Sequence, residues 1–334
     1  RVLLEGNVFE NCWADGQNGM AILVTPRNQG NTAPWCGTQD ITFRFNKVLN
    51  SEGVLSVSGS DDTYSSQVTD RITVTDNFWK LSYSGSGNHY GVSWVTSHAY
   101  QSGAHPKNLH FVNNTVIHTN GGGNSGVIDS NGTKMTGIIY RDNIVSNASY
   151  GFIGNGTADG NATISGHFDT DAVFTYNVII GGDSGQYTGR TGCQFPANVA
   201  AVSFTDSASD DYSLSGGSSY KNDGSDSTDP GADWTALNSA TLYTVTGQWG
   251  SEPATYSDRT YTNAELPQTY VDSRYAAQSG QLWTATNTSG SSVAGTGALN
   301  ATGGSLTYAL ANCSVGDTIE LTAGATYTLS SSIS

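Results

Sequence analysis

The chain has 334 residues, of which 41 are glycine and only 12% are charged. Its 28 acidic and 13 basic residues give a net charge of -15, which opposes binding to nucleic acids or anionic membranes, because clustered Lys and Arg supply most of the affinity for them. No apolar stretch approaches the roughly 18 residues of a membrane-spanning helix, so no membrane span is expected. The richness in Gly, Ser, Thr and Asn favours short strands and turns, and predicts an all-β fold.

The first half of the chain contains a repeat with the pattern apolar-x-apolar-x-x-Asn-x-apolar. Alternation before each asparagine predicts a strand with one buried face, and the apolar residue after it predicts a second strand in a new direction. Asparagine suits the bend, because it tolerates the left-handed conformation and its amide can hydrogen-bond the backbone. Stacked bends predict a ladder of amides. The repeats VLLEGNVF, ITFRFNKV, ITVTDNFW, LHFVNNTV, IIYRDNIV and AVFTYNVI contribute Asn7, Asn46, Asn77, Asn114, Asn143 and Asn177.

The repeat spacing predicts a solenoid. Intervals of 39, 31, 37, 29 and 34 residues suit coils of about three short strands joined by loops, as in a parallel β-helix. A six-bladed propeller is the alternative, but four strands per blade leave little room between Asn114 and Asn143. We expect β-helix coils over residues 1–239, a Ser/Thr/Gly-rich linking segment over 240–296, and new opening coils over 297–334. Strands are predicted at Asp317–Leu321 and Thr326–Leu329.

The stretch RVLLEGNVFENCWADGQNGMAILVTPRNQ, followed by DITFRFNKV, resembles the later coils of right-handed parallel β-helix proteins of the pectin-lyase-like superfamily. It resembles in particular a group of large secreted bacterial proteins. DYSLSGGSSYKN and DPGADWTAL resemble the closing segment of that group, whereas LPQTYVDSRY and GGSLTYALANCSVGDTIELTAGATYTL resemble its mature start. The resemblance therefore implies a right-handed β-helix, located outside the cell or on its surface, with its segments in permuted order.

The permuted order of these segments favours the interpretation that the sequence is one repeat unit of a longer array. In such an array, the opening coils at the end of one unit are completed by the next identical unit. We therefore expect the structural repeat unit of an extracellular fibre, assembled head to tail and coated with glycans. A truncated or rearranged fragment is the alternative reading of the same order. The apolar side chains that need covering are Ile319, Leu321, Tyr327 and Leu329. Their expected cover is the coil of Val2, Leu4 and Phe9 in a neighbouring unit.

A carbohydrate-active enzyme is the second hypothesis, because the resemblance implies polysaccharide lyases and glycoside hydrolases among its relatives. A lyase of this kind uses carboxylates to hold calcium and a basic side chain to take a proton. Asp61 and Asp62, with Asp70 and Arg71 nearby in the sequence, are candidates for such a site; the alternative is a solvated Asp-rich turn. No carboxylate pair stands out for a hydrolase. Calcium is the cofactor that such a lyase would require.

A glycan-binding surface adhesin is the third hypothesis. The segment Phe78–Tyr100 concentrates aromatic side chains that could form a sugar platform or fill the coil interior instead. The candidates for ligand binding are Tyr83, Tyr90, Trp94 and Tyr100. Eight N-x-S/T sequons are candidate glycosylation sites, although an Asn-rich composition produces nearly as many by chance. They are Asn113, Asn131, Asn147, Asn155, Asn161, Asn287, Asn300 and Asn312.

The four cysteines form no C-x-x-C motif. Cys12 and Cys36 are 24 residues apart, close to one coil, so they could stack in neighbouring layers and form a disulfide. The alternative is that they are small buried side chains with free thiols.

Overall fold

The computed structural model describes residues 2–12, 20–82, 91–96, 105–119, 127–129, 134–246, 283–286, 292–295 and 318–321. The chain separates into two compact units, Arg1–Pro267 and Gln268–Ser334. The point of separation falls within the segment 240–296 that the sequence predicts as a link.

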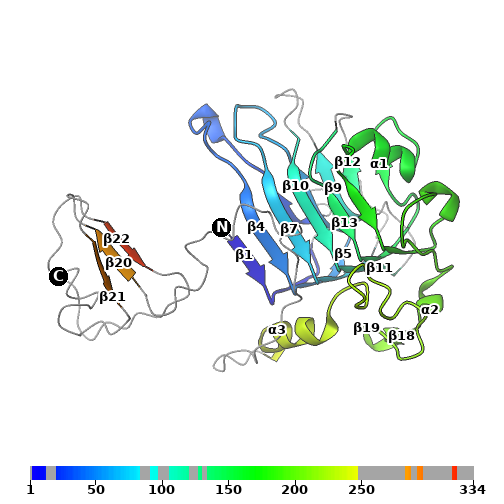
Figure 1. The fold of residues 1–334 in the computed structure, drawn as a ribbon. Coiled ribbons are helices and arrows are strands. Elements are labelled where there is room, and N and C mark those ends of the chain that lie inside the picture. Colours follow the sequence, from blue (N-terminus) through cyan, green and yellow to red (C-terminus); the bar gives the residue numbers. More distant parts are fainter. Residues whose placement is uncertain are drawn as a thin grey trace. The chain divides into compact units, whose positions relative to one another are not determined.

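The first unit is built on three parallel sheets that wind together as a β-solenoid (Figure 1). The first sheet contains β1 (Val2–Glu5), β4 (Gln39–Arg44), β7 (Asp70–Thr75), β10 (Lys107–Val112), β13 (Ile139–Arg141) and β16 (Val173–Thr175). The second contains β2 (Val8–Glu10), β5 (Lys47–Ser51), β8 (Phe78–Leu81), β11 (Thr115–His118), β14 (Ile144–Ser146) and β17 (Val178–Ile180). The third contains β3 (Met20–Val24), β6 (Gly53–Ser58), β9 (Gly91–Thr96), β12 (Val127–Asp129) and β15 (Ile153–Gly154).

Every strand pair within these three sheets is parallel and joins equivalent positions of successive coils. The all-β parallel β-helix expected from the asparagine spacing is thus confirmed as a parallel β-solenoid. The propeller alternative is wrong, because its blades would pair neighbouring strands antiparallel. The right hand of the coil stays a prediction.

The interior of the solenoid is filled by the two apolar positions that flank each asparagine. On the second and later coils these side chains are buried: Phe43, Val74, Phe111, Tyr140 and Phe174 before the asparagine, and Val48, Trp79, Val116, Val145 and Ile179 after it. Leu4 and Phe9 of the first coil are only partly buried. Full burial of such a side chain contributes roughly 1.5–3 kcal/mol, so these stacks account for much of the stability of the coil.

The end of the solenoid that follows β16 and β17 is closed. Tyr187, in the short helix η3 (Ser184–Tyr187), stacks on Phe174 with ring centroids 5.9 Å apart, and Phe195 stacks on Tyr187 at 5.5 Å. Helix α1 (Asn161–His167) adds Ile164 to the same core. The last apolar layer is therefore covered by the chain itself.

Residues 199–246, here called the strap, run along the outer face of the second sheet. They comprise α2 (Val199–Val202), β18 (Phe204–Asp206), η4 (Ser207–Ser209), β19 (Asp211–Leu214) and α3 (Trp234–Thr246). Figure 1 shows α3 and the β18–β19 hairpin along one side of the stacked sheets. The strap and the sheet share a second hydrophobic core that includes Phe45, Phe78, Ile117, Ile144, Val178, Val202, Tyr212 and Leu237.

The strap runs from the last coils back towards the first. Its contacts follow that order: Ser225 with Asp142, Ala232 with Thr115, Asp233 with Asp76, Asn238 with Lys47, and Thr244 with Gly6. Helix α3 continues across residue 240, where the sequence predicts the end of the coil region. The segment that resembles a closing coil thus lies along the side of the solenoid.

The second unit contributes the antiparallel strands β20 (Trp283–Thr286), β21 (Ser292–Gly295) and β22 (Thr318–Leu321), in the order β21-β20-β22. Strand β22 corresponds to the predicted strand Asp317–Leu321. The predicted strand Thr326–Leu329 lies outside the described residues. Among the helices that the structure describes, none has the length and apolar character to cross a membrane.

Candidate functional site

The bend of each coil is made by a residue in the left-handed conformation, and that residue comes directly before the ladder asparagine. The φ angles are 69° for Gly6, 51° for Phe45, 53° for Asp76, 55° for Asn113, 57° for Asp142 and 55° for Tyr176. The six asparagines themselves do not have positive φ. The expectation that asparagine supplies the left-handed residue is therefore wrong, and its role is hydrogen bonding alone.

The structure brings all six asparagines into one continuous row. The backbone N–H of each of the first five donates to the side-chain Oδ1 of the next, at 2.9–3.2 Å. The side-chain Nδ2 donates to the same oxygen at 2.9–3.1 Å. Each Nδ2 also donates to the carbonyl oxygen two residues earlier in its own coil. Every step thus satisfies backbone groups that the bend removes from the sheets.

The donating direction is the same along the whole row, so its two ends differ. At the end that follows Asn177, Cys193 takes the position of a seventh asparagine. The backbone N–H of the next residue, Gln194, donates to the carbonyl oxygen of Asn177 at 2.9 Å, as the residue after each ladder asparagine does in the earlier coils. The Cys193 sulfur accepts from both the backbone and the side chain of Asn177. Burial raises the pKa of the Cys193 thiol, although these hydrogen bonds act in the opposite direction. The thiol therefore closes the row as a neutral acceptor.

The opposite end of the row is open. In the described part of the chain, no donor reaches Oδ1 of Asn7, whereas Oδ1 of Asn46 accepts two hydrogen bonds. Strands β1, β2 and β3 are the terminal strands of their sheets. Val2 and Leu3 are 48% and 54% exposed. We call β1, β2, β3 and Asn7 the first-coil edge; among the described residues, no strand pairs with its outer side and no donor reaches its amide oxygen, so a further parallel coil could be added there.

Asp61, one of the candidate calcium ligands, holds a loop together. It is buried, and its carboxylate accepts hydrogen bonds from the backbone N–H of Asn28, Thr63 and Tyr64, each at 2.8 Å. Burial acts to raise the pKa of Asp61, but these N–H groups and the charge of Arg27 outweigh it and hold the pKa below its usual range. Asn28 precedes the short helix η2 (Gln29–Asn31). Asp61 thus fastens the loop after β6 to the loop of the preceding coil.

Asp62 and Arg71 belong to separate clusters. Asp62 forms an exposed ion pair with Arg27, which lowers the pKa of the Asp62 carboxyl. The Arg71 guanidinium binds Asp40 with two hydrogen bonds, of 2.6 and 3.0 Å, and also pairs with Asp70. The candidate base therefore lies between two other carboxylates. Among the described residues there is no group of three or more His, Cys, Asp or Glu side chains suited to a metal ion.

The structure describes only part of the predicted aromatic platform. Trp79 points into the solenoid and is fully buried. Trp94 lies on β9, where the backbone alone is described. Tyr83, Tyr90 and Tyr100 lie outside the described residues.

The sequons occupy different environments. Asn113 and Asn147 are buried, so the folded solenoid cannot carry glycans there. Asn155 is exposed. The Asn161 side chain donates to the carbonyl oxygen of Thr188 and accepts from Arg190. Asn131, Asn287, Asn300 and Asn312 lie outside the described residues.

Cys12, Cys36 and Cys193 are free cysteines, so the predicted disulfide between Cys12 and Cys36 is wrong for this structure. The physical reason is the coil length. Equivalent positions of the first two coils are 39 residues apart. A separation of 24 residues instead places Cys12 after β2 and Cys36 between β3 and β4, at different corners.

Comparison of this chain with protein-family models, with curated proteins and with solved structures finds no match.

Proposed function

We propose that this chain is a structural unit of an extracellular β-solenoid fibre, in which identical units join head to tail at the first-coil edge. The asymmetry between the two ends of the solenoid supports this proposal. One end is closed by Cys193, Tyr187 and Phe195, whereas at the other end no described strand pairs with the outer side of β1, β2 and β3, and Val2 and Leu3 are exposed. An end of that kind favours association with another parallel coil.

The occupant of the first-coil edge is the 297–334 segment of a second copy. Because the far end of the solenoid is closed, one solenoid does not stack directly on the next, and the added coil comes from another part of the chain. Ile319 and Leu321 have the same alternation as Val2 and Leu4, so both pairs can face one interior. Contact between unlike surfaces of identical chains does not close on itself and therefore generates filaments.

The proposal of a fibre also bears on the location of the protein, its glycan coat and its relatives. A filament of this type belongs outside the cell or on its surface, and Asn155 is a sequon that is exposed among those that the structure describes, where a glycan coat would be attached. The relationship to pectin-lyase-like β-helix proteins is part of the same proposal. Cleavage of a polysaccharide has less support, because Asp61 and Arg71 are engaged in separate structural clusters.

A matched pair of substitutions in β1 tests the fibre. Leu4 faces the interior, against the core, whereas Leu3 faces outward on the same strand. In a free chain, the ammonium group that Leu4→Lys introduces can reach water through the open end; beneath a further coil the charge would be buried at a cost of several kcal/mol. Leu4→Lys should therefore abolish assembly, whereas Leu3→Lys should leave it intact.

The assay is sedimentation velocity and electron microscopy of the full chain over a range of concentrations. The proposal expects filaments that lengthen with concentration for the unaltered chain and for Leu3→Lys, and monomers with an unchanged circular dichroism spectrum for Leu4→Lys. A chain that stays monomeric at all concentrations contradicts the fibre. Filaments that form equally well with Leu4→Lys contradict the first-coil edge as the junction.

A further inference from the structure

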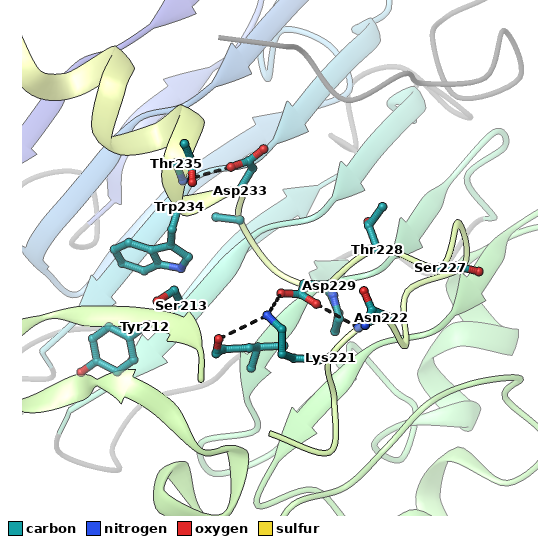
Figure 2. Close-up of a pocket in the computed structure, with 13 residues that line it drawn as sticks. Tyr212, Ser213, Lys221, Asn222, Ser227, Thr228, Asp229, Asp233, Trp234 and Thr235 are labelled. Carbon is teal, nitrogen blue, oxygen red and sulfur yellow. Dashed lines mark hydrogen bonds and ion pairs between the residues drawn. The ribbon is translucent and has the colours of Figure 1, made fainter. Parts of the chain in front are cut away.

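The strap contains a cavity of about 480 Å³ between strand β19, the loop 221–233 and the start of helix α3 (Figure 2). It is lined by strap residues and by none of the first-coil edge. Its volume is in the range of small-molecule sites, roughly 300–1,000 Å³. The cavity therefore has room for a small organic ligand.

One wall of the cavity is aromatic. The rings of Tyr212 and Trp234 have centroids 6.4 Å apart, and Trp234 packs on Phe78 of the solenoid at 5.0 Å. Both rings are thus fixed by the second core. The indole N–H of Trp234 is buried and has no acceptor in the described part of the chain. Because this N–H has essentially no accessible surface, it does not face the cavity, and the aromatic wall offers the ring surfaces of Tyr212 and Trp234.

The other wall is polar. Lys221 Nζ pairs with Asp229 Oδ2 at 2.7 Å, and the Asn222 backbone N–H donates to Asp229 Oδ1 at 2.9 Å. Figure 2 shows this pair to one side of the rings of Tyr212 and Trp234. An ammonium group donates and a carboxylate accepts, so the pair can bind two neighbouring hydroxyl groups at once. Asp233, which also lines the cavity, accepts from the first N–H groups of α3.

We propose that this cavity binds a neutral saccharide of one or two rings. The C–H face of a pyranose is apolar and fits an aromatic wall, while its hydroxyl edge needs mixed donors and acceptors like those of Lys221 and Asp229. The net charge of -15, with two carboxylates in the lining, disfavours an anionic sugar, nucleotide or phosphate. This site is additional to the proposed fibre and does not depend on it.

The test is isothermal titration calorimetry of the full chain with defined probes. The neutral probes are the methyl glycosides of glucose, galactose and mannose, N-acetylglucosamine, cellobiose and mannobiose; digalacturonate is the anionic probe. Saturation-transfer NMR identifies the sugar face in contact with the rings. The variants are Trp234→Phe, which keeps an aromatic ring but reduces its area, together with Lys221→Gln and Asp229→Asn. Lys80→Gln is the matched control, because Lys80 pairs with Asp210 outside the cavity lining.

At least one neutral probe should bind, with saturation strongest on its C–H face. Lys221→Gln and Asp229→Asn should each weaken binding by about tenfold or more, and Lys80→Gln should leave it unchanged. If Trp234→Phe fails to fold, as judged by circular dichroism, the two polar variants decide the outcome. Three results would overturn the proposal: no neutral probe binds, digalacturonate binds more tightly than any neutral probe, or the polar variants bind as well as the unaltered chain.

Discussion

Replacement of one interior ladder asparagine tests whether the row of amides holds the coils together. Asn143 is buried, and its Nδ2 donates to the carbonyl oxygens of Phe111 and Arg141, each at 2.9 Å. Its Oδ1 accepts the backbone N–H of Asn114 at 2.9 Å. Within the row, Asn143 Oδ1 also accepts from Asn114 Nδ2 at 3.1 Å, and Asn143 Nδ2 donates to Asn177 Oδ1 at 3.0 Å. Because Asn143 does not have positive φ, Asn143→Ala adds no backbone strain and removes only these side-chain hydrogen bonds.

The substitution leaves one buried backbone N–H and two buried carbonyl oxygens without this partner. An unsatisfied buried donor costs about 1–3 kcal/mol, and each lost hydrogen bond contributes about 1 kcal/mol, so we expect a loss of about 3 kcal/mol in the free energy of unfolding. Asn7→Ala is the control: Oδ1 of Asn7 accepts no bond in the described part of the chain, and only two part-buried bonds from its Nδ2 are lost, so the loss should stay at about 1–2 kcal/mol. Urea denaturation followed by circular dichroism measures both. Equal losses, or a loss below about 0.5 kcal/mol for Asn143→Ala, would refute the role of the row.

Burial, with the charge of Arg141, lowers the pKa of His110 from 6.5 to about 4. As the pH falls, the unfolded chain binds a proton at this histidine before the folded chain does, so the free energy of unfolding should fall by up to about 3 kcal/mol between pH 6.5 and pH 4. Urea denaturation across this pH range should show a weaker pH dependence for His110→Gln. An unchanged pH dependence would contradict the buried, neutral state of His110. In the same assay, Asp61→Ala should lower the free energy of unfolding by about 2–3 kcal/mol and Asp62→Ala by less than about 1 kcal/mol. The reason is that Asp61, unlike Asp62, accepts hydrogen bonds from three backbone N–H groups. A larger loss for Asp62→Ala would contradict the structural role of Asp61. Gly231→Ala should speed amide hydrogen exchange in the strap, because Gly231 has a φ of +83° and the added Cβ would lie 2.6 Å from Thr115 Oγ1. Unchanged exchange would contradict the close packing of Gly231 against the second sheet.

The sequence predicts the solenoid well because each coil repeats the same local requirements. The apolar residues beside Asn46, Asn77, Asn114, Asn143 and Asn177 had to face one interior, and the regular position of the asparagine fixed where the chain turns. Those two features determine which residues pair between coils, even though the loops between them vary in length.

Other features depend on contacts that no local pattern encodes. The left-handed residue before the asparagine is variable, ranging from Gly6 to Phe45 and Tyr176, so its conformation cannot be read from residue type. The asparagine pattern does not identify Cys193 as the end of the row, because a thiol replaces the amide there. Phe195, two residues later, still occupies the apolar position of the repeat. The strap has no repeat of its own; its course follows from individual contacts with the outer face of the second sheet.

The cavity proposed to bind sugar also depends on contacts that the sequence pattern does not encode. Tyr212 and Trp234 are 22 residues apart, and Lys221 and Asp229 lie between them in a Gly/Ser/Asp-rich loop that reads as an ordinary turn region. Only the packing of both rings against the second sheet brings them together.

Cryo-electron microscopy of the full chain, imaged as it assembles in solution, tests the central proposal most directly. The fibre predicts a filament in which residues 317–329 of one copy form strands parallel to, and in register with, strands β1 and β2 of the next copy. In that filament, Oδ1 of Asn7 accepts hydrogen bonds from the added coil. Discrete monomers, or filaments joined without residues 1–10, would contradict the proposal.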